Sequence, residues 1–364
     1  MGWLSCRINI DTGAQGRHDS TGRPDFQPQR HAVPYSSWME KAAKPALLGI
    51  DWGTSNRRAW WLAANGVVVA EHNDDQGLLA CQGRFADALQ LLLRAGPALP
   101  PSAPVLMAGM VGAASGWLEA PYMGAREPLA GLARHLMVVP AAGDRSFIVP
   151  GVCFSAPDGT VDVMRGEETQ LLGALALGHG DGWYVLPGTH SKWVRLQDSC
   201  VADLATYMTG ELFALLTQHG TLSSVTRQAA VDPLEHVPAY RQAQASSSEA
   251  VHAPTATSAF TRGIAAASRS GLSNALFGCR AQVVAGCMPA AEARDYLSGL
   301  LIGAEWHDVV RRAGGRAPEH ITLIGSADLA QRYAWVAEAA GCRITALDAR
   351  SVQLAAFGVL RAHL

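Results

Sequence analysis

The chain lacks the long apolar runs and the charge excess that mark several classes of protein. No stretch approaches the roughly 18 to 20 apolar residues that a membrane helix needs. Charged residues are only 16% of the 364 residues, and the formal net charge is -2, so nothing favours binding to nucleic acid or to an anionic membrane. The first residues also lack the compact apolar core of a signal peptide. We therefore expect a cytoplasmic protein whose partners are small molecules; the sequence carries no signal for an oligomeric state.

Metal-ligand and disulfide patterns are missing as well. No CxxC pair and no Cys/His spacing typical of a zinc site occurs. The seven cysteines are Cys6, Cys81, Cys153, Cys200, Cys279, Cys287 and Cys342. An odd and scattered set favours reduced thiols over a disulfide framework.

The first 44 residues differ from the rest of the chain. They are polar, rich in Gly, Pro, Gln and Arg, and have no apolar period. Such a segment cannot bury enough surface to offset the entropy of ordering it. We expect residues 1–44 to be a disordered extension, or translation to start at Met39, just ahead of the first clear strand.

One pattern of strand, glycine turn and two further strands occurs twice along the chain. Strands are predicted over 46–51, 57–63, 67–72, 182–188, 192–197 and 201–208. The pattern places "GTSNR" at 53–57 against "GTHSK" at 188–192. The distance along the sequence between these two turns is too long for a solenoid repeat and indicates a duplicated domain.

Helical spacing and glycine stops predict the elements between and after these strands. Helices are expected over 84–96, 167–178 and 210–220, a strand over 104–109, and a strand, Gly-Ser turn and helix over 320–341. A last helix closes the chain.

Both glycine turns suit phosphate. Glycine lets backbone N–H groups approach an anion closely, and hydroxyl and amide side chains add donors. The candidate residues are Gly53, Thr54, Ser55 and Asn56 in the first turn and Gly188, Thr189, His190, Ser191 and Lys192 in the second. Asp51, which ends the first strand, can hold Mg²⁺ directly or through water. One such turn alone could be an ordinary β-hairpin. The matching second turn favours a site in which both turns bind one phosphate chain.

Three segments resemble the motifs of the sugar kinase, Hsp70 and actin superfamily. "LLGIDWGTSNRRAWWL" resembles the first phosphate motif, "VLPGTHSKWV" the second, and "ITLIGSADLAQRY" the adenosine motif. The resemblance implies an α/β fold with two ribonuclease H-like lobes over 45–180 and 181–364 and an ATP·Mg²⁺ site in the cleft between them. By the same resemblance Gly325 and Ser326 approach the nucleotide.

Five segments together are similar to the 2-keto-3-deoxygalactonate kinase (2-dehydro-3-deoxygalactonokinase) family. They are "GIDWGTSNRRAW", "MAGMVGAASGWLEAPY", "DVMRGEETQLLGAL", "LPGTHSKW" and "YMTGELFALL". The resemblance implies transfer of the ATP γ-phosphoryl group to a primary hydroxyl of this sugar acid, giving its 6-phosphate in galactonate breakdown. The sequence leaves the galactonate and gluconate epimers undistinguished. Pro187 replaces the Asp found in many superfamily members, which leaves more of the magnesium role to Asp51.

The same resemblance implies a catalytic base at the start of the helix over 167–178. Glu167, with Glu168 as the alternate, would accept the proton of the attacking hydroxyl. The alternative is that both are helix-start charges favoured by the helix dipole. Arg165 could hold the substrate carboxylate in a bidentate pair, or could be solvated.

Other candidates for the sugar-acid site are an aromatic wall and polar groups. Trp117, Glu119 and Tyr122 are the candidates in the segment 107–122, although Trp117 could equally be packing. Lys192 could steady the transferring phosphoryl group or be solvated surface. Thr209–Glu211 resemble a helix N-cap, and the family resemblance places Glu211 in the cleft.

Two other functions remain open. A phosphohydrolase of the same superfamily is favoured by Glu in place of Asp at the base position, with water as the acceptor. A nucleotide-dependent binding protein without catalysis is the second. The segment Trp117–Tyr122 argues against both, because neither needs a carbohydrate wall.

Overall fold

The computed structural model describes residues 44–227 and 258–364. The predicted disordered extension over 1–44, apart from its last residue, therefore lies outside the described residues. The described residues belong to one compact unit. Within the described ranges, no helix is long and apolar enough to cross a membrane. The described cysteines, from Cys81 onward, are free thiols.

A six-stranded sheet is built from the first part of the chain. Its strand order is β3-β2-β1-β4-β7-β6, with β1 antiparallel to β2 and parallel to β4. The strands are β1 Pro45–Trp52, β2 Arg57–Ala63, β3 Val68–Asp74, β4 Val105–Gly109, β6 Met137–Val138 and β7 Ser146–Ile148. Asn65 and Gly66 form the hairpin turn between β2 and β3, with Gly66 at a φ of +83° and the Asn65 side chain accepting from Val67 N–H at 3.1 Å.

A five-stranded sheet repeats this topology later in the chain. Its order is β12-β11-β10-β13-β14, again with an antiparallel three-stranded meander followed by parallel strands. The strands are β10 Gly182–Leu186, β11 Ser191–Gln197, β12 Cys200–Tyr207, β13 His320–Gly325 and β14 Arg343–Asp348. Strands β10, β11 and β12 match β1, β2 and β3 in order and direction, as the predicted duplication requires.

A small third sheet precedes the helix that carries the predicted base. It has the order β5-β8-β9, and its strands are β5 Tyr122–Gly124, β8 Gly151–Ser155 and β9 Val161–Met164. Short 3-10 helices lie nearby and later: η1 Met110–Gly112, η2 Leu129–His135, η3 Pro140–Ala142 and η5 Ala290–Glu292.

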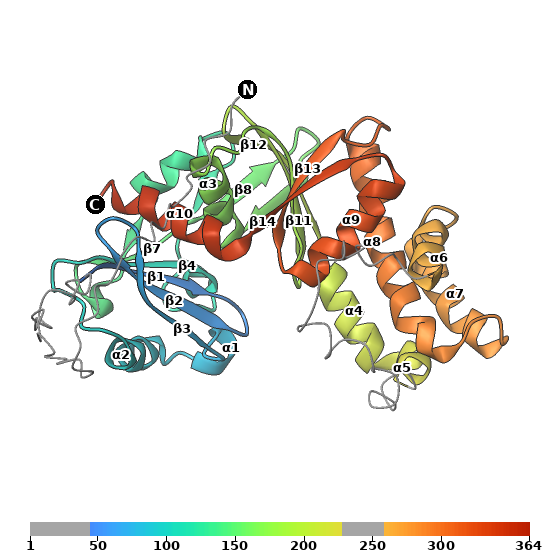
Figure 1. Ribbon diagram of the computed structural model, residues 1–364, viewed down its shortest axis with the longest axis horizontal. Coiled ribbons are helices and arrows are strands. Elements are labelled where there is room, and N and C mark those ends of the chain that lie inside the picture. Colours follow the sequence, from blue (N-terminus) through green and yellow to red (C-terminus); the bar gives the residue numbers. More distant parts are fainter. Residues whose placement is uncertain (1–43, 228–257) are drawn as a thin grey trace, which may run out of the picture. The chain divides into compact units, whose positions relative to one another are not determined.

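Helices cover the sheets on both faces. The helices are α1 Leu78–Cys81, α2 Phe85–Ala95, α3 Glu167–Ala176, α4 Thr209–Gln218, α5 Gly220–Thr226, α6 Ser258–Ala267, α7 Leu272–Val284, α8 Ala293–Arg312, α9 Ala327–Ala339 and α10 Ala349–Arg361. Helices α4 to α8 gather into one group, and α3 lies beside α10 (Figure 1).

Alternation along β1 explains how one sheet has two buried faces. Leu48, Ile50 and Trp52 pack with α2, whereas Leu47 belongs to the core that contains α3 and α10. Gly49 leaves room on that second face for the ring of Phe357 in α10. The same core includes side chains of β10 and β11, so α3 and α10 share packing with both large sheets.

The adjacent Trp60 and Trp61 on β2 both pack in the protein interior. Each is only 1% exposed, and they fall into different cores because neighbouring strand residues face opposite ways. The predicted lobe boundary at residue 180 stays a prediction: the large sheets fall on either side of it, while α10 packs against α3 and β1.

Candidate active site

The first glycine turn is held by its own backbone and by the start of a helix. Gly53 N–H donates to Asn56 O at 2.9 Å. The N-terminal end of α1 docks on this turn, with Leu78 N–H donating to Gly53 O at 2.9 Å and Leu79 N–H to Thr54 O at 3.1 Å. These contacts fix the backbone of the turn while leaving its outer face accessible.

The second glycine turn is held in the same way. Glu211 N–H, in the first turn of α4, donates to Thr189 O at 2.9 Å. Gly210 allows α4 to approach the carbonyl of Gly188 closely, because a Cβ at this position would collide with it. Each Gly-Thr turn is therefore braced by the N-terminal end of a helix.

The two turns line one hollow of about 540 Å³. Its lining residues are Asp51, Gly53, Thr54, Arg58, Gly109, Met110, Arg165, Gly166, Glu167, Gln170, Leu186, Pro187, Gly188, Thr189, His190, Ile324, Gly325, Ser326, Leu329, Asp348, Ala349 and Arg350. Most of the residues predicted for phosphate and adenosine thus meet here. Ser55 and Asn56 are exposed at the rim and do not line it, and Ser191 and Lys192 are buried beside it.

Asp51 lies at the base of this hollow. Burial raises the pKa of its carboxyl, and the charge of Arg58, whose Nη2 is 3.5 Å from Oδ2, acts against that rise. Gly109 stands next to it at a φ of +91°, and a Cβ there would lie 2.7 Å from Trp52 O and 3.5 Å from Asp51 Oδ1. Glycine at 109 therefore keeps open the space beside the carboxylate.

Glu167 and Glu168 are neighbours with different surroundings. Glu167 is half-buried and lines the hollow, and its Oε2 accepts Arg165 N–H at 3.0 Å. Burial raises its pKa, while the charge of Lys192 lowers it. Glu168 is fully buried outside the hollow, and both its oxygens accept Gly166 N–H, at 2.9 and 2.8 Å.

The buried environment of Glu168 raises the pKa of its carboxyl group. Burial and the adjacent charge of Glu167 raise the pKa of Glu168 to about 8. Thr169 Oγ1 also donates to it, at 3.0 Å. Only Glu167 of the pair shares the hollow with Asp51 and the Gly-Thr turns.

Arg165 has unused hydrogen-bonding capacity at the wall of the hollow. Its Nη2 donates to Ala120 O at 2.8 Å, and its guanidinium lies over the ring of Tyr122 at 4.3 Å from the centroid. Its Nε and Nη1 are buried with no hydrogen-bond partner among the described residues. Gly112 makes room for it, since a Cβ there would lie 2.9 Å from Nη1. A buried guanidinium with unpaired donors suits an anionic ligand.

Lys192 is a buried residue rather than solvated surface. It is 7% exposed, and its Nζ donates to Val163 O at 3.0 Å and to Thr206 Oγ1 at 2.9 Å. Val163 lies on β9, which leads into the segment that carries Glu167. The ammonium group therefore ties β11 to that strand.

Four of the predicted substrate residues do not line the hollow. Trp117 stacks on Phe85 with ring centroids 6.3 Å apart and packs against the core under α2. Glu119 is exposed, and Tyr122 contacts the hollow only through Arg165. Glu211 accepts a hydrogen bond from His190 at 2.5 Å at the rim.

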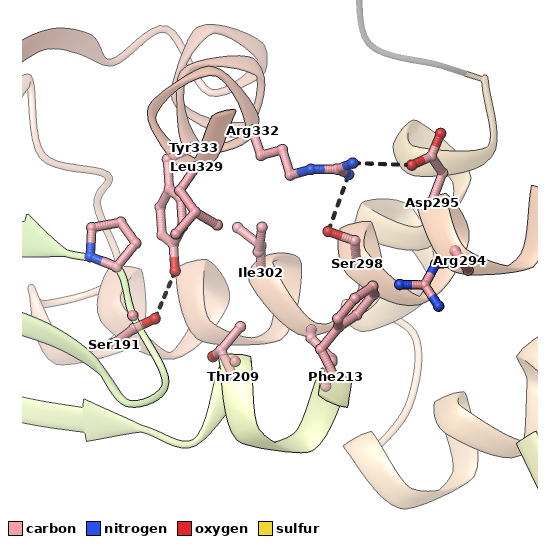
Figure 2. Close-up of a pocket in the computed structure, with 14 residues that line it drawn as sticks. Ser191, Thr209, Phe213, Arg294, Asp295, Ser298, Ile302, Leu329, Arg332 and Tyr333 are labelled. Atoms are coloured by element: carbon pink, nitrogen blue, oxygen red, sulfur yellow. Dashed lines mark hydrogen bonds and ion pairs between the residues drawn. The ribbon is translucent and has the colours of Figure 1, made fainter. Parts of the chain in front are cut away.

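A second cavity of about 250 Å³ adjoins the second glycine turn. It shares Pro187, Gly188 and Leu329 with the larger hollow. Figure 2 shows its wall, with Thr209 and Phe213 on α4, Ile302 on α8 and Tyr333 on α9 around an open space. At the far end Arg332 donates to Ser298 Oγ and Asp295 Oδ1, each at 3.2 Å.

Sequence reasoning missed several lining residues. Arg58, Gln170, Asp348 and Arg350 all reach the larger hollow. Asp348 had a local signal, since it caps α10 by accepting Ser351 N–H at 2.9 Å. The others carry no pattern that separates them from surface residues.

The magnesium prediction is compatible with the residues present. In the described ranges, no group of three or more His, Cys, Asp or Glu side chains gathers as a metal site. Mg²⁺ does not need one, because it is commonly held by one or two carboxylates together with water and substrate phosphates. Asp51, with the open space beside it, meets that requirement.

Comparisons with known proteins agree on one family. The family model described as 2-keto-3-deoxy-galactonokinase matches residues 51–361. The 2-dehydro-3-deoxygalactonokinase of Escherichia coli (strain K12) is 35% identical over 82% of this chain and 92% of its own length. A Rhizobium meliloti (strain 1021) protein with the same name, given provisionally, is 36% identical over 82% of this chain and 91% of its own length.

A solved structure gives the same result for the fold. It is a Sinorhizobium meliloti protein that carries the provisional name 2-dehydro-3-deoxygalactonokinase, with a TM-score of 0.72 and 32% identity. The match covers 86% of this chain and 95% of that chain. Together with the paired sheets described above, this confirms the predicted two-lobed sugar kinase and actin fold. The chain belongs to the 2-keto-3-deoxy-galactonokinase family.

Proposed function

We propose that the protein transfers the γ-phosphoryl group of ATP to 2-dehydro-3-deoxy-D-galactonate, giving 2-dehydro-3-deoxy-6-phospho-D-galactonate in galactonate catabolism. The observation that carries this proposal is the hollow in which two helix-braced Gly-Thr turns meet Asp51, Glu167 and Arg165. Phosphate, magnesium, a proton acceptor and a carboxylate-binding cation are what such a transfer requires.

The nucleotide is assigned to the two adjoining cavities. Its phosphates would lie between Gly53–Thr54 and Gly188–Thr189, where backbone N–H groups can approach them. Its base would enter the smaller cavity, whose apolar wall includes Phe213, Ile302 and Leu329. Gly188 lines both spaces and marks where the base and phosphate parts join.

Arg165 is assigned to the carboxylate of the sugar acid. Its Nε and Nη1, which have no hydrogen-bond partner among the described residues, keep N–H donors and a positive charge for a carboxylate. Stacking on Tyr122 keeps the guanidinium plane fixed. The attraction between this guanidinium and the substrate carboxylate would select a sugar acid over a neutral sugar.

Glu167 is assigned as the base. It would take the proton of the substrate's primary hydroxyl as that oxygen bonds to the γ-phosphorus and the bond to the β-phosphate oxygen breaks, releasing ADP. Its adjacent Lys192 charge favours the ionised form that can accept a proton. Glu168, buried and bonded to Gly166 N–H, would instead hold the turn that leads into α3.

Asp51 is assigned to Mg²⁺, which when bound would neutralise charge on the phosphate oxygens. The Arg58 guanidinium beside it faces the same hollow and would contact phosphate oxygens. Asp51 and Arg58 thus bring opposite charges to the place where the phosphate chain would end.

A coupled ADP-release assay with and without the sugar acid tests the proposal. We expect ADP release that depends on the acid. ADP release without the acid would favour the phosphohydrolase, and ATP binding without turnover under either condition would favour a non-catalytic nucleotide-binding protein.

A further inference from the structure

Glu305 on α8 is a buried carboxylate without a cation. It is 2% exposed, and no ion pair among the described residues includes it. Burying a carboxylate is costly unless other groups hydrogen-bond to it. Its surroundings supply those bonds from three separate elements.

Three donors converge on this carboxylate. Thr209 Oγ1, on α4, donates to Oε2 at 2.6 Å. Tyr333 OH, on α9, lies 2.8 Å from Oε1 and 3.0 Å from Oε2. Trp193 Nε1, on β11, donates to Oε1. A fourth residue, Ser191, lies 2.9 Å from the Tyr333 hydroxyl.

When Glu305 is ionised, each hydrogen bond of this network has one donor proton and one acceptor. Trp193 N–H can only donate, and the hydroxyls of Thr209 and Tyr333 each supply one proton to the carboxylate. Ser191 then donates to the Tyr333 oxygen. Burial raises the pKa of the Tyr333 hydroxyl, so it keeps its proton. Burial also raises the pKa of Glu305 to about 7, against the effect of these donors.

Three members of this network form the wall of the smaller cavity. Ser191, Thr209 and Tyr333 line it (Figure 2). Glu305, which accepts hydrogen bonds from Thr209 and Tyr333, does not line it. Thr209 is also the first residue of α4, whose next residues contact the carbonyls of Gly188 and Thr189. A change at Glu305 can therefore reach both the cavity wall and the second glycine turn.

We propose that Glu305 is a positioning residue for the nucleotide: its carboxylate holds Thr209 and Tyr333 at the cavity wall and, through α4, holds the Gly188–Thr189 turn in register. The inference rests on the proposed function, which places the nucleotide in this cavity. Glu305 touches neither substrate. Its loss should thus affect ATP binding and leave the acceptor site alone.

The test is Glu305→Gln, assayed at about pH 8 so that the wild-type group is mostly ionised. Glutamine keeps the volume but brings an NH₂ donor toward groups that are themselves donors. We expect KM for ATP to rise about tenfold, the scale of one lost charge-assisted hydrogen bond. KM for the sugar acid and kcat should stay within about threefold. Tyr333→Phe removes one donor and should raise KM for ATP in the same direction by a smaller factor.

Tyr184→Phe is the matched control. Tyr184 is a buried tyrosine of β10 whose hydroxyl donates to Gly180 O at 2.6 Å, and it lines neither cavity. This variant should lower the melting temperature without changing KM for ATP. If Glu305→Gln does not fold, Tyr333→Phe carries the test alone.

Three results would overturn the inference. Wild-type turnover with an unchanged KM for ATP in both Glu305→Gln and Tyr333→Phe, or an equal rise of both Michaelis constants, would remove the positioning role and leave the proposed function standing. Absence of ATP binding by the wild type, measured by calorimetry, would remove the proposed function and this inference together.

Discussion

Replacing Glu167 with glutamine tests its role as the base without altering the other groups of the site. Glu167 Oε2 accepts Arg165 N–H at 3.0 Å, and an amide oxygen can keep that bond. The amide cannot accept a proton from the attacking hydroxyl. Glu167→Gln should therefore leave the shape of the hollow intact while removing one chemical function.

The expected loss follows from the usual contribution of general-base catalysis. It is about 10² to 10⁴-fold in kcat, or roughly 3 to 5 kcal/mol of transition-state free energy. KM for ATP should change by less than about threefold, because the Gly-Thr turns hold the phosphates. The assay is steady-state ADP release with each substrate varied in turn.

The pH profile adds an independent reading of the same group. Burial raises the pKa of Glu167 above its usual value of 4.5. The ionised form is the active one, so wild-type kcat should fall as the pH drops through that raised pKa, at a pH above 4.5. Glu167→Gln should lose this acidic limb.

Glu168→Gln is the control for this experiment. Glu168 lies outside the hollow and accepts Gly166 N–H with both oxygens. Its replacement should cost about 1 to 2 kcal/mol of stability through weakened hydrogen bonds and leave kcat within about threefold. Unchanged kcat in both variants would refute the carboxylate-base mechanism. Greater sensitivity at Glu168 would keep the mechanism and move the base by one residue.

Three further substitutions test the other assignments. Asp51→Asn should reduce kcat by more than about 10²-fold with little loss of stability, and retained activity at saturating magnesium would argue against the phosphate site. Arg165→Lys should raise KM for the sugar acid by about tenfold or more through loss of the planar guanidinium and its N–H donors, with KM for ATP unchanged; equal changes in both would exclude carboxylate recognition. Trp117→Ala should lower the free energy of unfolding by about 1.5 to 3 kcal/mol in urea titrations, since Trp117 stacks in a core. A selective rise in KM for the sugar acid would instead restore its predicted role as an aromatic wall.

The strands of the two antiparallel meanders were well predicted because their patterns are local, whereas β6, β7 and β14 of the same sheets were not predicted. The expected strand over 57–63 coincides with β2, and that over 46–51 falls within β1. Both are apolar runs bounded by turn residues, and the Gly-Thr turns recur at matching places. The region 110–164 gave no such prediction, because its strands and 3-10 helices are too short to show a period.

The site was predicted in part, for a related reason. Residues within motifs, such as Gly53 and Gly188, could be found from the local pattern and the resemblance. Arg58 and Arg350 could not, because only the folded chain brings their separate elements to one hollow. The burial of Lys192 was also hidden, since it depends on partners on β9 and β12.

The product of the reaction tests the central claim most directly. Purified protein incubated with ATP, Mg²⁺ and 2-dehydro-3-deoxy-D-galactonate can be followed by proton-coupled ³¹P nuclear magnetic resonance. The account predicts a new phosphomonoester signal split by the methylene protons of the primary carbon, appearing together with ADP. Inorganic phosphate as the sole new phosphorus product besides ADP would contradict it, because water and not the sugar acid would then be the acceptor.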